Sequence, residues 1–291
     1  MKYLITGAGG QLGTEWGRFL ATSEDYESVA FASQELDITD PESVRRVLKA
    51  EKPDVVINCA AYTAVDRAES EPEAAFRVNR DGVRHLAGAC AEIGARLVHY
   101  STDYVFPGRA GDRKRYPDGY PENAERDPVN RYGESKLAGE LELEKSGVDW
   151  LLVRVSWLCS PSGSNFVNTM LRLGSERNEL KVVDDQIGSP SFTFDVVGKT
   201  ITLLEKGQTG AFHISCDGAI SWADFAKEIF LQQGMDARIV RVSSSEYPTE
   251  ASRPAFSLLS IEKIRFEELT PLHWKDGLRK LLEQKKMRYE D

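Results

Sequence analysis

The sequence predicts an α/β protein built on a Rossmann-type, doubly wound parallel sheet, with a smaller C-terminal α/β lobe. Short apolar runs, such as residues 3–5 and 55–59, have the composition of buried parallel strands. They alternate with segments in which apolar residues recur at helical spacing. A glycine-rich turn joins the first strand to the first helix, and this arrangement is typical of doubly wound sheets.

Composition and charge exclude several classes of protein. The 291 residues can form one large α/β unit or two unequal domains. A formal net charge of -9 and a pI near 5.2 argue against nucleic acid or a membrane as a partner. A local cationic pocket is compatible with that charge.

The cysteines and the N-terminus indicate where the chain works. The four cysteines are scattered, without a Cys-x-x-Cys pair or histidines at ligand spacing, so we expect neither a zinc site nor a disulfide framework. The N-terminal residues enter the first strand at once, and no apolar run reaches transmembrane length. We therefore expect a cytoplasmic protein.

Residues 6–13 form the turn after the first strand and carry Gly7, Gly10 and Gly13. From Leu12 to Leu20, apolar residues recur at helical spacing. Glycines allow the backbone to turn sharply and approach a pyrophosphate, whose charge the N-terminus of a helix stabilises. The spacing is Gly-x-x-Gly-x-x-Gly, because position 12 is Leu. We interpret it as a dinucleotide-binding turn, the alternative being a glycine turn without a ligand.

The second strand is expected at residues 29–32, and the third at 55–59. Between them, Asp40 precedes Pro41 as the cap of a helix. Asp37 can accept a hydrogen bond from an adenine amine or form an Asx-turn, and the sequence leaves both open. Ala60, Ala61 and Tyr62 follow the third strand, where small residues let a dinucleotide lie close.

A helix is expected to begin at Pro72, followed by a strand at residues 97–100. Ser101, Thr102 and Asp103 stand at the carboxyl end of that strand, where doubly wound sheets bind their ligands. Residues 107–128 are polar and rich in Gly, Pro and charge, and so predict a surface loop.

Tyr132 and Lys136 are four residues apart on the next predicted helix, and therefore on one face. An ammonium close to a phenol favours the phenolate and lowers its pKa from about 10. The pair can therefore supply an acid near neutral pH. A solvated Tyr and Lys on a surface helix is the alternative, because the motif alone is short.

The second half contains fewer parallel-strand patterns. A strand is expected at 150–155, helices from Phe166 and at 196–204, a short strand at 182–183, and a capping box at Ser221. We predict a dinucleotide-binding domain of residues 1–157 plus about 191–215. The substrate-binding lobe would comprise about 158–190 plus 216–291.

The glycine turn, the strand-end Ser-Thr-Asp and Tyr-x-x-x-Lys, in this order, resemble the extended short-chain dehydrogenase/reductase family. Longer motifs at residues 55–66, 101–106, 132–140 and 183–190, and Arg253-Pro254, are similar to its dTDP-4-dehydrorhamnose reductase branch. The resemblance spans nearly the whole chain. It implies NADPH-dependent reduction of the 4-keto group of a dTDP-linked sugar, giving dTDP-L-rhamnose.

The resemblance also implies roles for individual residues. Tyr132 would donate the proton, Lys136 would hold the nicotinamide ribose and lower the Tyr132 pKa, and Thr102 would bind the substrate carbonyl. The implied dinucleotide contacts are Gly7, Gly10, Gln11, Leu12, Asp37, Ile38, Ala60, Ala61 and Tyr62, together with Tyr132 and Lys136. The implied substrate contacts are Thr102, Asp103, Trp157, Asn165, Phe166, Gln186 and Arg253. A guanidinium suits a pyrophosphate better than an ammonium does.

The chain departs from the family pattern at two points. Ser33-Gln34 stands where an arginine often meets the 2'-phosphate, so we expect NADPH with NADH also accepted. Family members are sometimes described as Mg²⁺-dependent, so Mg²⁺ is possible, but no carboxylate cluster for that ion can be placed and we predict no metal-ligating residues. A homodimer is compatible with this class.

Two other functions compete with this one. One is another nucleotide-sugar enzyme of the same fold, a 4-ketoreductase, an epimerase or a 4,6-dehydratase. The sequence speaks against the dehydratase alone, because that reaction resembles one needing Thr-Asp-Glu where this chain has Tyr104 in third place. A non-catalytic NADP-binding regulatory subunit is the other. The joint presence of Thr102, Tyr132 and Lys136 favours an enzyme.

Overall fold

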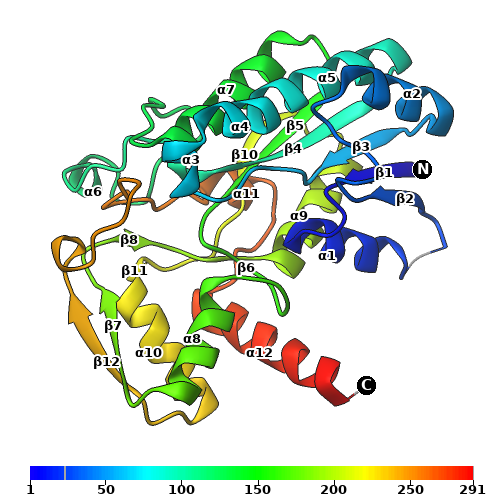
Figure 1. Cartoon of the computed structure of the whole chain (residues 1–291). Helices are drawn as coiled ribbons and strands as arrows, with labels where there is room; N and C mark the ends of the chain where they lie inside the picture. The colour runs from blue at the N-terminus through cyan, green and yellow to red at the C-terminus, as the bar shows by residue number, and fades with distance from the viewer. Residues whose placement is uncertain (23, 291) are drawn as a thin grey trace.

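The computed structural model describes residues 1–22 and 24–290, the last three by their backbone alone. Its centre is a six-stranded parallel sheet in the order β10-β5-β4-β3-β1-β2 (Figure 1). The strands are β1 (Lys2–Thr6), β2 (Glu27–Phe31), β3 (Val55–Asn58), β4 (Arg96–Thr102), β5 (Trp150–Val155) and β10 (Gly210–His213). This confirms the predicted doubly wound fold.

Helices cover both faces of the sheet (Figure 1). On one face lie α1 (Gln11–Leu20) and α9 (Thr193–Glu205), whose apolar side chains form one core with the strands. On the other face lie α2 (Pro41–Glu51), α5 (Gly82–Ile93) and α7 (Arg131–Lys145), over a second core. Burial on both faces explains why the strand sequences are continuously apolar.

The predicted helix starts are confirmed by their caps. Asp40 accepts hydrogen bonds from the backbone N–H groups of Glu42 and Ser43 at the start of α2. Asn130 caps α7 by accepting from Gly133. Each cap satisfies N–H groups that have no partner inside the helix.

One helical run contains an irregular turn. The short helices α3 (Arg67–Ser70) and α4 (Pro72–Phe76) lead into a π-helical turn at Arg77–Asp81 and then into α5. There α7 packs so closely that a Cβ on Gly139 would lie 2.1 Å from the backbone oxygen of Asn79. Glycine at this position therefore allows the helix carrying Tyr132 to approach the π turn.

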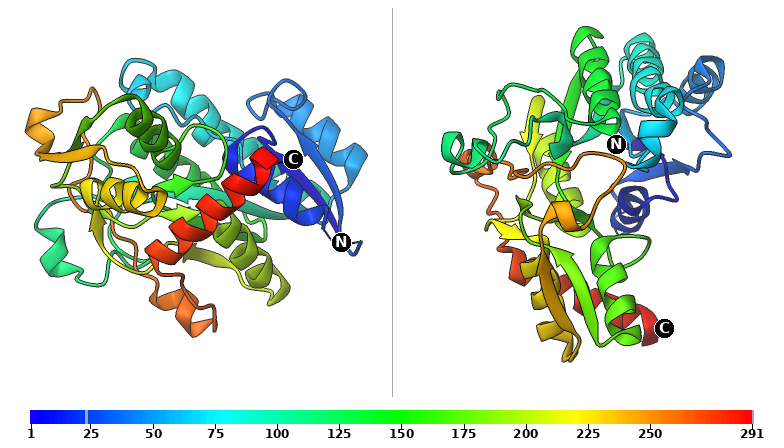
Figure 2. Two further views of the ribbon diagram at one scale, coloured as in Figure 1. Left: turned by 90° about the horizontal axis from the view of Figure 1, so that it is seen from below. Right: turned by 60° about the vertical axis from the view of Figure 1, so that its left-hand side comes forward.

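A second lobe lies below the sheet (Figures 1 and 2). Its helices are α8 (Phe166–Glu176), α10 (Trp222–Gln233) and α12 (Trp274–Glu290). Its strands pair two by two: β7 (Glu179–Val183) with β12 (Arg238–Val242), β8 (Ile187–Gly188) with β11 (Ile220–Ser221), and β6 (Leu158–Cys159) with β9 (Ser191–Phe192). The capping box predicted at Ser221 and Asp224 begins α10.

Two segments outside the regular strands of the large sheet contain side chains that are buried in a hydrophobic core. Residues 107–128 include α6 (Asp112–Arg115) and the buried Tyr120, whose ring stacks on Phe106 at 4.7 Å. The prediction of a surface loop was therefore wrong for this part. In the C-terminal half, α11 (Glu262–Phe266) packs Ile264 into the core of the large sheet. The proposed domain boundary stays a prediction, with this segment reaching back across it.

Candidate active site

The glycine turn between β1 and α1 forms a close backbone cradle. Gly7 has φ +66°, and a Cβ there would lie 2.6 Å from the Ala60 backbone nitrogen. A Cβ on Gly13 would lie 2.3 Å from the Gly7 oxygen. Gly10 caps α1 without a side-chain hydrogen bond, which leaves its first-turn N–H groups free of a side-chain acceptor. This cradle fits a dinucleotide pyrophosphate.

The loop after β2 answers one open question. Asp37 accepts a hydrogen bond from the Thr39 N–H at 2.9 Å, so the Asx-turn alternative is present. Its carboxylate is nevertheless exposed and can still reach a ligand. The Ile38 side chain is buried against α5, where a Cβ on Gly82 would lie 2.5 Å from it. Ile38 can therefore offer an adenine ring its backbone rather than its side chain.

Residues 60–62 are fixed by two buried asparagines. Asn58 at the end of β3 accepts from the Ala60 N–H at 3.2 Å. Asn79, in the π turn, accepts from the Tyr62 N–H at 2.9 Å and donates to the Tyr62 oxygen at 3.0 Å. Asn79 also donates to the Ser135 hydroxyl on α7 at 2.9 Å. The predicted dinucleotide loop is thereby joined to the helix of Tyr132 and Lys136.

Tyr132 and Lys136 line one cavity with the glycine turn. This cavity has a volume of about 350 Å³ and is also lined by Ala60, Ala61 and Ser101. The Lys136 ammonium donates to the Tyr100 carbonyl oxygen at 2.7 Å. The Thr102 hydroxyl lies next to that of Tyr132 and donates to Asp103 Oδ1 at 2.9 Å. The structure thus brings the three predicted catalytic residues to one place.

The electrostatics of this trio differ from the expected pattern. Burial, followed by the Asp103 carboxylate, raises the pKa of Tyr132 above its ordinary value, so the expected lowering is wrong for this arrangement. Burial lowers the pKa of Lys136 to about 8, with Glu140 opposing the shift. Burial also raises the pKa of Asp103 to about 7. The site therefore gathers groups that gain or lose a proton near neutral pH.

An aromatic cluster lies where Trp157 meets the second lobe. Trp157 adopts a left-handed backbone conformation, φ +46°, which is rare for a bulky residue. Its ring stacks on Trp222 with centroids 3.6 Å apart, and Phe166 contacts Trp222 at 4.5 Å. A Cβ on Gly188 would lie 2.8 Å from the Trp157 ring. These neighbours hold the indole in its strained position.

Residues 158–165 approach the glycine turn across the lobes. The Gln11 side-chain oxygen accepts hydrogen bonds from Ser160 Oγ and from Asn165 Nδ2, both at 2.9 Å. Asn165 also caps α8 by accepting from the Asn168 N–H at 3.0 Å. Gly163 and Ser164 line the cavity together with Gln11. Gln11 and Asn165, predicted for different ligands, are thus joined to each other.

The last two predicted substrate residues make ordered contacts elsewhere, and none of the predicted substrate residues is among those that line this cavity. Gln186 donates to the Ser244 hydroxyl at 2.9 Å. Arg253 donates to Asp66 Oδ2 at 2.7 Å and lies beside Tyr104. Its Nη1 is buried and has no hydrogen-bond partner among the described residues. An unsatisfied guanidinium N–H is suited to an anionic ligand.

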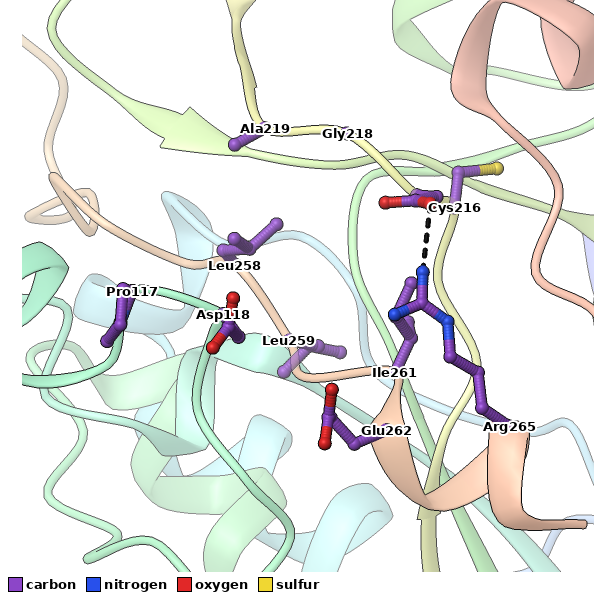
Figure 3. Close-up of a pocket in the computed structure, with 11 residues that line it drawn as sticks. Pro117, Asp118, Cys216, Gly218, Ala219, Leu258, Leu259, Ile261, Glu262 and Arg265 are labelled. Atoms are coloured by element: carbon purple, nitrogen blue, oxygen red, sulfur yellow. Dashed lines mark hydrogen bonds and ion pairs between the residues drawn. The ribbon is translucent and has the colours of Figure 1, made fainter.

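A separate cavity of about 190 Å³ lies beside α11 (Figure 3). Arg265 and Glu262 of α11 and Asp118 of the 107–128 segment surround it. It shares no lining residue with the cavity of Tyr132. In the described part of the chain, no three His, Cys, Asp or Glu side chains are placed to hold a metal ion. No helix there is long and apolar enough to cross a membrane.

Sequence reasoning missed several residues of the site. Asn58, Asn79 and His99 are buried polar residues inside apolar or helical segments, and this mismatch was the available signal. Trp222 is adjacent to the predicted capping box but was not connected to Trp157. Asp66 is the last residue of the motif at residues 55–66, where the sequence alone assigns it no role.

Fold and site together define a dinucleotide-dependent oxidoreductase of the extended short-chain dehydrogenase/reductase class. The family model described as "RmlD substrate binding domain" matches residues 1–287. A dTDP-4-dehydrorhamnose reductase of Burkholderia thailandensis is 42% identical over 91% of this chain and 92% of its own. The Bacillus subtilis spore coat polysaccharide biosynthesis protein SpsK is 39% identical over 98% of both chains.

Solved structures give the same result. A dTDP-4-dehydrorhamnose reductase of Bacillus anthracis, in complex with NADP, has a TM-score of 0.92 at 39% identity, covering 97% of this chain and 99% of its own. A Thermus thermophilus UDP-glucose 4-epimerase in complex with NAD has a TM-score of 0.78 at 19% identity, covering 98% of this chain and 99% of its own, which shows the shared fold alone. The chain belongs to the dTDP-4-dehydrorhamnose reductase family.

Proposed function

We propose that this protein reduces the 4-keto group of dTDP-4-dehydro-L-rhamnose to dTDP-L-rhamnose with NADPH, in nucleotide-sugar biosynthesis. The observation that carries the proposal is that Tyr132 and Lys136 line the cavity of the glycine turn, with the Thr102 hydroxyl beside that of Tyr132. Membership of the reductase family supports the sugar and the reaction. The NADP complex of the Bacillus anthracis relative supports the phosphorylated dinucleotide.

Each residue of the trio has a distinct task in this reaction. The reduced nicotinamide, when bound, supplies a hydride to the sugar C4. Tyr132 gives its phenolic proton to the oxygen that becomes the alkoxide. Thr102 hydrogen-bonds that oxygen, and for this it must turn its hydroxyl hydrogen away from Asp103. Lys136 holds the nicotinamide ribose and supplies positive charge beside the phenolate that Tyr132 becomes.

The substrate is expected to lie against the second lobe. The Trp157 ring would offer an apolar face to the sugar, and Asn165, Phe166 and Gln186 would contact it from the second lobe. Arg253 would bind the pyrophosphate through its unsatisfied Nη1. Asp66 keeps the guanidinium in place.

The test is to follow NADPH oxidation with purified protein and a panel of nucleotide-linked 4-keto sugars. The expected result is turnover of the dTDP-4-dehydro-L-rhamnose substrate with dTDP-L-rhamnose as product. Turnover no faster than that of the Tyr132→Phe variant would contradict the proposal. Turnover of another base or sugar in preference would keep the chemistry and replace the substrate.

The setting of the reaction follows from the same proposal. The partner is a small nucleotide sugar, and we expect the protein to work in the cytoplasm, where such sugars are made. A homodimer stays a prediction, and light scattering of the purified protein measures it directly.

A further inference from the structure

A chain of four buried polar side chains runs from the glycine turn to Lys136. Thr6 Oγ1 donates to Asn58 Oδ1 at 2.8 Å, and Asn58 Nδ2 lies 3.0 Å from His99 Nδ1. His99 Nε2 lies 3.5 Å from Lys136 Nζ. All four residues are at most 2% exposed. Buried polar groups need partners, so the hydrogen atoms of this chain are constrained.

The donor and acceptor roles in this series of hydrogen bonds follow from the backbone N–H of Ala60. A backbone N–H can only donate, and that of Ala60 donates to the same Asn58 oxygen that Thr6 reaches. Asn58 therefore points its NH₂ group at His99 Nδ1, which must accept. A neutral imidazole that accepts at Nδ1 carries its hydrogen on Nε2. That hydrogen points toward Lys136.

An N–H group facing an ammonium sets two donors against each other. The conflict disappears when the lysine is a neutral amine, because its nitrogen then accepts the hydrogen bond. Burial acts in the same direction, with the pKa of Lys136 lowered to about 8 and that of His99 well below its usual value. The imidazole consequently stays neutral, and the lysine is poised between its two forms.

We propose that Asn58 and His99 are positioning residues, which present an imidazole N–H to Lys136 and so let it serve as a reversible proton donor to Tyr132. The proposal rests on the proposed function. In each turnover the Tyr132 phenolate takes a proton from the lysine, leaving an amine that the imidazole N–H stabilises. Water at the cavity then returns the proton to the lysine, so that the net proton comes from solvent.

Few other charges can replace this control. Besides Lys136, the titratable groups that line the cavity are Cys59, Tyr100 and Tyr132. His99 and Glu140 act on Lys136, and Asp103 and Tyr104 act on Tyr132. Glu140 favours the ammonium, but its carboxylate is held by Arg154 and Arg126. On α3 and the π turn, Arg67 and Arg80 are partly exposed and form ion pairs with Glu71 and Asp81.

The first experiment observes the tautomer without any activity measurement. The chain has four histidines, so imidazole ¹⁵N labelling of the full-length protein gives four sets of signals. His99, assigned by its loss in His99→Gln, is expected to show a protonated Nε2 and a bare Nδ1 from pH 6 to 9. A protonated Nδ1 or an imidazolium would overturn the proposal, whether or not the protein reduces any sugar.

The second experiment removes the presented N–H. In His99→Gln the side-chain oxygen can accept from the Lys136 ammonium, which favours the charged lysine. The alkaline limb of the kcat profile should then move up by about one pH unit, while the Kd of NADPH changes little. His273→Gln, a change at an exposed histidine, is the matched control and should leave the limb in place.

The variant Asn58→Asp tests the same proposal by changing the hydrogen-bond partner of His99 Nδ1. An ionised carboxylate accepts from Nδ1–H, which reverses the tautomer and turns the Nε2 lone pair toward Lys136. If the ¹⁵N spectrum shows the reversed tautomer, the alkaline limb of the kcat profile should move to higher pH. If the tautomer is unchanged, the limb should keep its position. A reversed tautomer with an unmoved limb, or an unmoved limb in His99→Gln, would refute the proposal.

Discussion

The residues that we propose for the dinucleotide offer mostly backbone, whereas those that we propose for the sugar nucleotide offer mostly side chains. The glycine turn and residues 60–62 present main-chain groups held by strand ends and by buried Asn58 and Asn79. The residues proposed for the substrate include Trp157, supported by a stacked Trp222 of the second lobe, and an arginine held by an ion pair. A backbone surface suits a cofactor shared by many enzymes, whereas side chains can be exchanged to suit one sugar.

This contrast predicts which binding or kinetic constant each group of variants should change. Changes on the cofactor side should alter dinucleotide affinity, and changes in the second lobe should alter only the KM of the sugar. At the junction, Thr102 and Tyr132 should alter mainly kcat, whereas Lys136, which is proposed to hold the nicotinamide ribose, should alter dinucleotide affinity as well. The predictions below test this separation, beginning with the largest expected effect.

Tyr132→Phe removes the proton donor at the junction while keeping its ring, which contacts Tyr104 edge to face at 5.6 Å. Loss of a positioned acid should lower kcat by about 10²-fold or more. The Kd of NADPH, measured by fluorescence titration, should stay within a few-fold of the parent. A kcat reduced only a few-fold would remove Tyr132 from the role of acid.

Arg253→Ala removes the guanidinium that faces the expected pyrophosphate. We expect the substrate KM to rise by about 10-fold or more, as for loss of a charge-assisted hydrogen bond. The Kd of NADPH should not change. Asp66→Asn is the matched variant, because it retains the guanidinium but weakens its anchor, and it should raise KM less. Equal KM values for parent and Arg253→Ala would place the pyrophosphate elsewhere.

Trp222→Ala removes the ring that stacks on Trp157. A left-handed backbone at a bulky residue is strained, so Trp157 should relax once its support is gone. The substrate KM is expected to rise several-fold through this loss of preorganisation, with kcat for bound substrate less affected. Trp222→Phe keeps a stacking ring and should recover most of the affinity. Equal loss in both variants would argue against stacking as the reason.

The large sheet and the second lobe also differ in how far the sequence alone predicts them. The large sheet was readable because parallel strands are continuously apolar and glycines mark the tight turn. The strands of the second lobe are often two residues long, as in β6 and β8, and carry no period to detect. His99 and Asn79 were missed because their partners lie between 17 and 56 residues away in the sequence, where only the fold brings them close.

The pKa of Tyr132 shows the same limit. Helical spacing correctly placed Tyr132 and Lys136 in one cavity. It could not show that the ammonium bonds the Tyr100 carbonyl, or that Asp103 is buried beside the phenol. Sequence spacing predicts which groups meet, whereas burial and competing partners decide their pKa values.

Asp103→Asn tests the junction through stability. Burial raises the pKa of Asp103 from 3.8 to about 7, and Oδ2 has no hydrogen-bond partner in the described structure. Between those pH values the folded protein holds a proton that the unfolded chain has lost, so stability falls as pH rises. The Asn variant avoids this loss.

Its Tm relative to the parent should therefore increase from pH 4 to pH 7 and then level off. A gain of a few degrees is expected, since each kcal/mol moves Tm by roughly 2–4 °C in a chain of this size. Thermal unfolding followed by circular dichroism at several pH values measures it. A Tm difference that is constant across this range would show that Asp103 titrates normally.

The smallest expected effect concerns the choice between NADPH and NADH. An enzyme that requires NAD usually places a carboxylate on the ribose 2'-OH, where it would repel a 2'-phosphate. Here Glu35, the nearest acid after β2, accepts from the Ala32 N–H at 2.8 Å and is occupied by its own loop. Ser33 and Gln34 are exposed and can donate to a phosphate, but they lack the charge that makes such recognition strong.

We therefore expect NADPH to be preferred over NADH by less than about 10-fold in kcat/KM, equivalent to less than about 1.4 kcal/mol. Ser33→Arg should widen the preference by adding the missing charge, and Glu35→Gln should change it little. Titrating both reduced dinucleotides at fixed substrate measures all three proteins. A large advantage for NADH that Glu35→Gln abolishes would make Glu35 the ribose acceptor, and the cofactor side would then discriminate by a side chain after all.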